Sequence, residues 1–180
     1  MLTTPGYQIT ETIYESVKTV IYRGYWVAQQ KSVILKAPST ENPGIADLAR
    51  LNHEYEITRD IHIRGIIQCY GLDTIDAKTF LVLEDFGGKS LDRIKTSSLF
   101  ELKEFLELAI QLADTLGELH KNQIIHKDIK PQNIIFNPQT REAKITDFSI
   151  ASRLSRETQA ISNPDRLEGT LAYMSPEQTG

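Results

Sequence analysis

Cysteine is almost absent from this chain, which has a single one, Cys69, in 180 residues. One cysteine excludes an internal disulfide and any metal site built from several cysteines. Cys69 lies in the strand-like run Ile66-Ile67-Gln68-Cys69-Tyr70. We therefore expect a buried structural thiol rather than a nucleophile.

Long apolar runs and concentrated basic stretches are also missing. No run approaches the length that spans a membrane, and the N-terminus lacks the basic and apolar segments of a signal peptide. The net charge of −4 argues against a protein that binds nucleic acid or a membrane surface. With 40% hydrophobic residues the composition is that of an ordinary globular protein. Because neither a signal peptide nor a membrane-spanning run is evident, we expect a cytoplasmic location.

The apolar pattern predicts a strand-rich first part and a helix-led second part. Strands are predicted at residues 7–14, 19–24, 32–37, 66–72 and 79–84, with one helix at 48–61 and a break at Gly87-Gly88. A second helix, from 101 to about 121, follows a capping box at 98–101. Its apolar side chains share one broad face: Leu102, Phe105, Leu106, Ala109, Leu112, Ala113, Leu116 and Leu119. A small hairpin is predicted at 134–136 and 143–146.

The most informative stretch is His126-Lys127-Asp128-Ile129-Lys130-Pro131-Gln132-Asn133, followed by Asp147-Phe148. It combines an acid, a lysine, an asparagine and, after the hairpin, a second acid. Phosphoryl transfer from ATP needs a carboxylate to orient the attacking hydroxyl, a cation for the migrating group and oxygen ligands for Mg²⁺. The spacing resembles the catalytic loop and magnesium-binding segment of eukaryotic-type serine/threonine protein kinases.

The resemblance covers essentially the whole chain and implies the α+β, two-lobe fold of protein kinases. Residues 1–87 would form a five-stranded antiparallel lobe with one helix, which covers the nucleotide. Residues 88–180 would form an incomplete, mainly helical lobe that ends just after the activation segment. In that family the nucleotide binds between the two lobes.

The run Val33-Ile34-Leu35-Lys36 resembles the third-strand motif whose lysine holds the α- and β-phosphates of ATP. Its carboxylate partner is expected to be Glu54 or Glu56, and only one of them can face inward because they are two apart on a helix. Glu54 is favoured, since Ile63-Arg64-Gly65-Ile66-Ile67 follows it at the distance found in the family.

The resemblance assigns the remaining roles by position. Asp128 would orient the substrate hydroxyl or accept its proton, and Lys130 would neutralise the moving phosphoryl group. Asn133 and Asp147 would hold Mg²⁺. Apolar side chains would cover the base of ATP, with Leu83 at the back of the pocket: Ile13, Ile21, Ile34, Ile135 and Leu83. The backbone from Glu84 to Phe86 would offer hydrogen bonds to the base.

The last motif, Gly169 to Glu177, resembles the substrate-docking end of a kinase activation segment. Thr170 would bond to Asp128 and Lys130, and His126 would pack against Phe148. The segment also carries candidate phosphorylation sites at Ser152, Ser155, Thr158 and Ser162.

Several positions depart from the family pattern. Tyr14, Ser16 and Thr19 replace the three loop glycines, Ile34 an alanine over the adenine, Ser149 a glycine after Phe148, and Lys127 the arginine beside the catalytic acid. A loop without glycine is expected to be stiffer and to contact phosphate less closely. A lysine binds phosphate as a point charge rather than as a fork, which argues against control by activation-loop phosphorylation.

Three functions remain open at this point. The first is an ATP- and Mg²⁺-dependent kinase of protein serine and threonine hydroxyls, within a larger signalling protein. The second is a catalytically weak, pseudokinase-like module. The third, a small-molecule phosphotransferase, is disfavoured by Lys130 and the Gly169–Glu177 segment, which serve peptide substrates in the family. Among kinase modules the chain most resembles those opening large bacterial multidomain sensor histidine kinases, so we expect further domains or a partner to cover the apolar face of the long helix.

Overall fold

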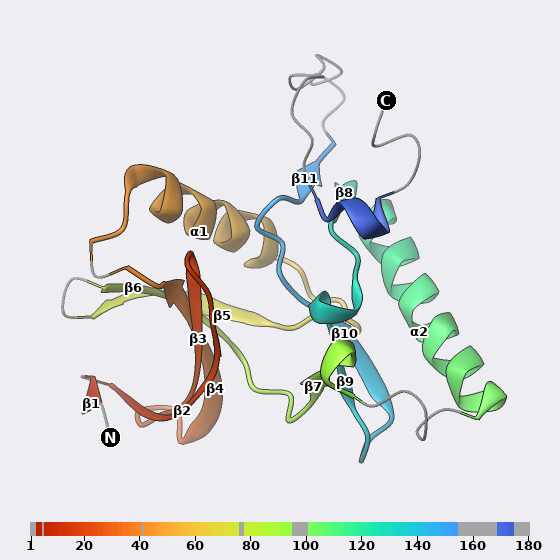
Figure 1. Ribbon diagram of the computed structural model, residues 1–180, viewed down its shortest axis with the longest axis horizontal. Coiled ribbons are helices and arrows are strands. Elements are labelled where there is room, and N and C mark those ends of the chain that lie inside the picture. Colours follow the sequence, from red (N-terminus) through yellow and green to blue (C-terminus); the bar gives the residue numbers. More distant parts are fainter. Residues whose placement is uncertain are drawn as a thin grey trace. The chain divides into compact units, whose positions relative to one another are not determined.

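The computed structural model describes residues 3–4, 6–40, 42–75, 78–94, 101–154 and 169–174 (Figure 1). The chain divides into two compact units. The first unit comprises residues 1–61 and 67–86, and the second comprises residues 62–66 and 87–180. Within the described ranges, no helix has the length and apolar character needed to cross a membrane.

The first unit is built on a six-stranded antiparallel sheet in the order β1-β2-β3-β4-β6-β5. Its strands are β1 (Thr3–Thr4), β2 (Tyr7–Glu15), β3 (Thr19–Trp26), β4 (Lys31–Pro38), β5 (Cys69–Ile75) and β6 (Lys78–Glu84). Five of them correspond to predicted strands, and the two-residue β1 is an addition at the edge beside β2.

The two faces of this sheet carry different side chains. One face holds the apolar cluster of Tyr7, Val20, Val33, Leu35, Ala37, Ile75, Phe80 and Val82. Directly opposed residues of antiparallel strands point to the same side of a sheet, and neighbours along a strand to opposite sides. The pairs Ile21↔Lys36, Arg23↔Ile34, Ile34↔Leu83 and Lys36↔Leu81 therefore define the other face, which we call the Lys36 face.

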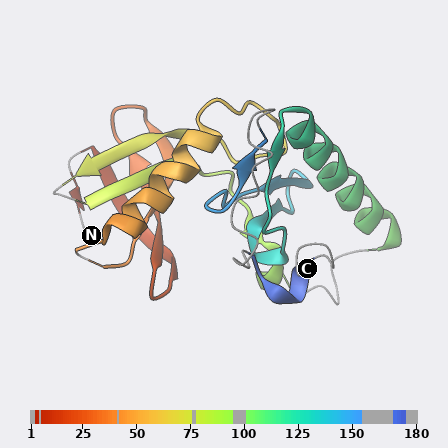
Figure 2. The ribbon, with the colours of Figure 1, turned by 90° about the horizontal axis from the view of Figure 1, so that it is seen from above.

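Helix α1 (Ile45–Thr58) contacts β4, β5 and β6 (Figure 2). It begins after Gly44, whose N–H donates to Asp47 Oδ2 at 3.2 Å. The helix starts three residues before the predicted 48–61 and ends three residues earlier. It ends there because the N–H of Ile61 bonds to Thr58 O, a shorter turn than that of an α-helix.

The segment 62–66 belongs to the second unit, which corrects the predicted strand at 66–72. Ile66 forms an isolated parallel bridge with Ile145, and the N–H of Ile145 donates to Gly65 O at 2.8 Å. Strand β5 begins only at Cys69. Apolar character continues through Ile66 and Ile67 because both are buried, although neither belongs to β5.

The second unit combines one long helix with small sheets. Its elements are β7 (Lys89–Ser90), η1 (Leu91–Arg93), α2 (Leu102–Lys121), β8 (Ile124–Ile125), η3 (Pro131–Asn133), β9 (Ile134–Asn137), β10 (Glu142–Ile145), β11 (Ser152–Arg153) and η4 (Leu171–Tyr173). Strands β10, β9 and β7 form one sheet, and β11 pairs with β8. Helix α2 contacts β10 and β8, and its Leu108 packs with Ile134, Phe136 and Ala143.

The Gly87-Gly88 break lies against β9. Gly87 has a φ of +73°, which side chains rarely adopt. A Cβ on Gly88 would lie 2.7 Å from Ile135 Cγ2 and 2.8 Å from Phe136 O. The double glycine therefore lets the chain approach the backbone of β9 before it enters β7.

Helix α2 exposes much of its apolar surface in the described structure. Residues 98–100 of the predicted capping box lie outside the described residues. Glu101 is instead the N-cap, and its N–H donates to Glu104 Oε2 at 3.1 Å. The helix buries Leu108, Thr115 and Leu119, whereas Leu102, Phe105, Leu106 and Ile110 are exposed. That further domains or a partner cover this face stays a prediction.

Gly65 tests the docking of segment 62–66 on α2. A Cβ at Gly65 would lie 1.8 Å from Oγ1 of the buried Thr115. We expect Gly65→Ala to lower the free energy of unfolding by about 2 kcal/mol through overpacking. The control is Gly117→Ala on α2, where the new Cβ meets nothing within 4 Å. We expect it to raise stability by about 0.5–1 kcal/mol through helix propensity. Denaturant unfolding measures both, and equal effects would contradict the close contact.

Candidate active site

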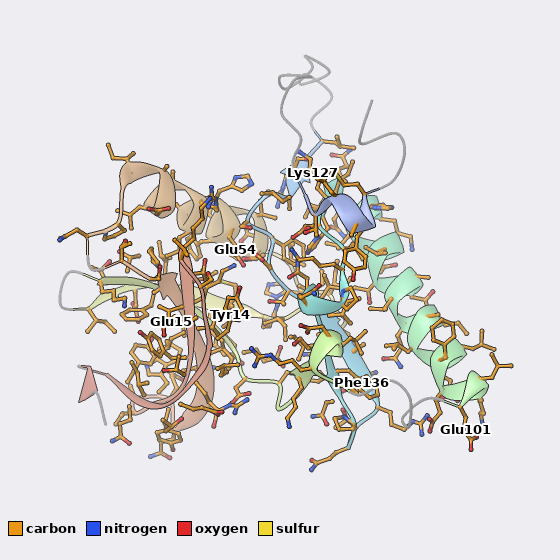
Figure 3. The ribbon with its side chains drawn as sticks, viewed as in Figure 1. Tyr14, Glu15, Glu54, Glu101, Lys127 and Phe136 are labelled. Carbon is orange, nitrogen blue, oxygen red and sulfur yellow. The ribbon has the colours of Figure 1, made fainter. Side chains whose placement is uncertain are left out.

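Lys36 is held in the first unit by a buried ion pair. Its Nζ lies 2.6 Å from Glu54 Oε2, and the two side chains are 11% and 3% exposed. Lys36 belongs to β4, and Glu54, which is labelled in Figure 3, belongs to α1. Each charge stabilises the other there, because a buried charge is costly unless it is paired.

Glu56, the alternative partner, points elsewhere. Its Oε1 accepts a hydrogen bond from Arg59 Nη1 at 3.0 Å, and both side chains are largely exposed. The structure thus places Glu54, which the sequence favoured, against Lys36. Two neighbouring glutamates take different roles because they are two positions apart on one helix.

The turn between β2 and β3 satisfies its own backbone groups. Ser16 Oγ accepts hydrogen bonds from the N–H groups of Thr19 and Lys18, at 3.1 and 3.4 Å. Ser39, just after β4, holds the turn from the other side, because its N–H donates to Lys18 O and its Oγ to Val17 O. Residues Tyr14 and Glu15 lead into this turn (Figure 3). Two turn amides are therefore already engaged, which explains in physical terms how the turn forms without glycine.

The residues predicted to cover a base are distributed over both units. Ile21, Ile34 and Leu83 lie together on the Lys36 face. Ile13 is at a register shift of β2, between Thr12 and Tyr14. Glu84 is the last residue of β6 and Phe86 lies two residues beyond it, whereas Ile135 lies on β9 in the second unit.

In the second unit, Asp128 is the centre of a hydrogen-bonded cluster. Its Oδ1 accepts from Thr170 Oγ1 at 2.8 Å, and its Oδ2 lies 2.6 Å from Lys130 Nζ. Lys130 Nζ also donates to Thr170 Oγ1 at 2.8 Å, so both hydrogen bonds predicted for Thr170 are present. Asn133 Nδ2 donates to Asp128 O and Oδ2, at 2.9 and 3.0 Å. The carboxylate is thereby fixed in one orientation beside a cation.

Asn133 and Asp147, the predicted magnesium ligands, are tied together through backbone. The N–H of Thr146 donates to Asn133 O at 3.0 Å, and Asp147 follows with a φ of +66°. Because the Asn133 nitrogen faces Asp128, the amide oxygen lies on the other side of the group. An amide and a carboxylate oxygen suit Mg²⁺, which usually takes one or two protein carboxylates and further oxygens from phosphates. Among the described residues, no three or more His, Cys, Asp or Glu side chains lie together in a group that could hold a metal ion.

His126 is a buried, neutral support for this loop. Its Nδ1 accepts from the Asp128 N–H at 3.2 Å, so Nε2 carries the proton and donates to Thr146 O at 3.0 Å. Burial lowers the pKa of His126, against the opposing effect of the Thr146 carbonyl. The ring packs edge-on against Phe148 with 4.6 Å between centroids, as predicted.

Two further features are not evident from the sequence. Arg23 joins Glu11 and Asp85, and Ser16 closes the β2–β3 turn on itself. Counting back from the turn places Glu11 opposite Gly24, but the register shift between Thr12 and Tyr14 moves it opposite Arg23. Ser16 does carry a local signal, since serine in a turn commonly bonds to a backbone group two or three residues on.

Comparison with known proteins identifies the family. Residues 7–180 match the model of the protein kinase domain. The chain belongs to the protein kinase domain family. The predicted α+β, protein-kinase-like fold is thereby confirmed, in agreement with the antiparallel sheet and helix α1 of the first unit.

Several relatives of this domain carry the name of serine/threonine-protein kinases. The chain is 29% identical over 167 residues to a probable serine/threonine-protein kinase, pknA2, of Bifidobacterium longum, covering 92% of this chain and 21% of that protein. It is 32% identical over 132 residues to serine/threonine-protein kinase PrkC of Bacillus subtilis, covering 73% and 20%. A match to serine/threonine-protein kinase TIO of Arabidopsis thaliana, 29% identical over 173 residues, covers 95% and 13%. The chain thus spans about a fifth, or less, of these relatives.

Glu54 and Glu56 form a matched pair for testing the buried ion pair. We expect Glu54→Ala to lower the free energy of unfolding by about 3 kcal/mol, because it removes the carboxylate that lies 2.6 Å from the buried Lys36 Nζ. Glu56→Ala removes only an exposed ion pair and is expected to have little effect. Urea unfolding measures both. A similar loss in the two variants would contradict the assignment of Glu54.

The neutral His126 predicts a pH dependence of stability. Its folded pKa lies below the unfolded value of about 6.5, so the unfolded state takes up the proton first. Stability from this group is full above about pH 6.5 and declines as the pH falls towards the folded pKa. We expect His126→Asn to flatten the unfolding free energy against pH in that window. His120→Asn, on the exposed side of α2, should leave the curve unchanged. An unaltered slope in His126→Asn would contradict the prediction.

Proposed function

We propose that this domain transfers the γ-phosphoryl group of Mg-ATP to a serine or threonine hydroxyl of a protein substrate. The observation that carries the proposal is the cluster of Asp128, Lys130, Asn133 and Thr170, in which an acid and a cation are fixed within 2.6 Å of each other. The names of the relatives support the choice of a protein hydroxyl as acceptor.

In the proposed reaction, Asp128 orients the acceptor hydroxyl and takes its proton. The hydroxyl oxygen forms a bond to the γ-phosphorus as the bond to the bridging oxygen of ADP breaks. Lys130 donates a hydrogen bond to the transferring group and offsets its charge. Thr170 holds the side chains of Asp128 and Lys130 in place through a hydrogen bond with each. Asn133 Nδ2 donates to the backbone oxygen and to Oδ2 of Asp128, so the carboxylate needs little rearrangement during the reaction.

Lys36, Asn133 and Asp147 are proposed to hold the nucleotide and its metal. Lys36 would bind the α- and β-phosphates, with Glu54 fixing the position of its Nζ. The amide oxygen of Asn133 and the carboxylate of Asp147 would bind Mg²⁺. When bound, this ion neutralises charge on the phosphate oxygens.

A second candidate function, a catalytically weak nucleotide-binding module, is favoured by one observation. The N–H groups of Lys18 and Thr19 already donate to Ser16 Oγ. A turn whose amides are engaged offers fewer donors to phosphate oxygens than a glycine loop does. Under this alternative the domain binds Mg-ATP through Lys36 and Asp147 but transfers the phosphoryl group slowly or not at all.

Calorimetric titration with ATP, with and without Mg²⁺, tests the proposed nucleotide site. We expect magnesium-dependent binding that Lys36→Met weakens at least about tenfold, because the variant loses a charge-assisted contact to phosphate. Lys31→Met, on the same strand but with its Nζ over the ring of Tyr70, is the matched control and should bind as the wild type does. Asp147→Ala should remove the dependence on Mg²⁺.

The outcomes separate the two candidates. Magnesium-dependent binding together with labelling of a protein substrate from γ-labelled ATP supports the kinase. Binding without transfer supports the weak module instead. A folded wild-type domain that binds no nucleotide would contradict both candidate functions.

A further inference from the structure

A charged group of three residues spans the Lys36 face of the first unit. Arg23 Nη1 lies 2.6 Å from Glu11 Oε2 on β2, and Arg23 Nε lies 2.9 Å from Asp85 Oδ2, just beyond β6. Arg23 thus links the first strands of the sheet to the chain segment that leaves it. Neither contact has a place in the proposed phosphoryl-transfer chemistry, so the arrangement calls for another explanation.

The position of Arg23 points to the base of the nucleotide. Arg23 is directly opposite Ile34, which is opposite Leu83, and all three side chains share the Lys36 face. Asp85 lies between Glu84 and Phe86, the two residues expected to offer backbone hydrogen bonds to the base. The charged group therefore adjoins the predicted base-binding residues of this unit.

The two carboxylates bonded by Arg23 differ in exposure. The Asp85 side chain is 10% exposed, whereas that of Glu11 is 56% exposed. Exposed pairs contribute little, but a nearly buried carboxylate needs a partner. A guanidinium can satisfy both at once because its donors are arranged in a rigid fork. The interaction with Asp85 is thus the one that constrains the backbone.

The segment is held from a second side as well. The Glu84 N–H donates to Gln68 O at 2.9 Å, and the Gln68 N–H donates to Glu84 Oε2 at 3.1 Å. Glu84 is anchored to the start of β5 and Asp85 to β3. The peptide groups of residues 84–86 therefore have little freedom to rotate.

We propose that Arg23 is a positioning residue that sets the preference for adenine, by fixing the backbone of residues 84–86 through Asp85. The inference rests on the proposed nucleotide site. Adenine presents an amino donor beside a ring-nitrogen acceptor, whereas guanine presents a carbonyl acceptor beside a ring N–H donor. A fixed backbone carbonyl and N–H can match only one of these orders, and the other base leaves polar groups unpaired.

Four single variants, one double variant and three ligands test the proposal. Arg23→Met, Arg23→Lys, Asp85→Asn and Glu11→Gln are titrated with Mg-ATP, Mg-GTP and Mg-tripolyphosphate, which lacks a base. We expect Arg23→Met and Asp85→Asn each to weaken ATP binding about tenfold and to lower the ATP-to-GTP affinity ratio, with tripolyphosphate unchanged. The ATP affinity of Arg23→Lys should fall between those of the wild type and Arg23→Met. Glu11→Gln should change ATP affinity less than Asp85→Asn does. The double variant Arg23→Met/Asp85→Asn should be no worse than either single variant, because the two act through one contact.

Amide hydrogen exchange provides a readout that needs no nucleotide. We expect Arg23→Met to speed exchange at Asp85 and Phe86 while the amides of α1 keep their protection, which separates local loosening from global unfolding. Arg59→Met, at the exposed end of α1, is the control and should alter neither binding nor exchange at 85–86.

The results distinguish failure of this inference from failure of the proposed function. Unchanged ATP affinity and base preference in Arg23→Met, with wild-type binding intact, would overturn the inference alone. Equal weakening of ATP and tripolyphosphate would also overturn it, because the effect would then not concern the base. Absence of nucleotide binding by the folded wild type would overturn both.

Discussion

A charge removed from water has to be paired, and each unit of this domain is arranged around one such pair. In the first unit, Lys36 and Glu54 are almost completely buried and lie 2.6 Å apart. That contact fixes which side of α1 faces the sheet, and strand alternation then assigns Ile34 and Leu83 to the same face. In the second unit, Asp128 is satisfied by Lys130, Asn133 and Thr170, which brings residues 42 positions apart into hydrogen-bond contact.

The supports around these pairs are made from backbone as much as from side chains. His126 receives the N–H of Asp128 and donates to the carbonyl of Thr146, so one neutral ring joins the loop before β9 to the residue before Asp147. The β2–β3 turn is held in a similar way, because Ser16 Oγ accepts a hydrogen bond from the Thr19 N–H of the same turn. That turn gains rigidity and leaves fewer amide donors for a ligand. The residues shared with the kinase family therefore favour phosphoryl transfer, whereas the engaged amides of this turn disfavour close contact with phosphate.

Most of the elements followed from local pattern, and the errors have physical causes. Strands β2 to β4 and β6 and both helices were predicted because their apolar spacing is regular. The strand predicted at 66–72 was wrong at its start, since Ile66 is buried by pairing with Ile145 rather than by belonging to β5. The capping box predicted at 98–101 places Glu101 three residues after the cap, whereas Glu101 is itself the N-cap. Burial and capping by different partners produce the same local pattern, so the sequence could not separate them.

By itself the sequence determined the family, the two-part order of strands and helices, and the spacing of Asp128, Lys130, Asn133 and Asp147, because these depend on residues close together in the chain. Tertiary structure decided which glutamate reaches Lys36, and that Arg23 joins Glu11 to Asp85. Those contacts depend on helix rotation and on the register shift in β2 between Thr12 and Tyr14, which arise from packing across the sheet. Local propensity is encoded residue by residue, whereas the pairing of distant charges is settled only when the strands and the helix are in place.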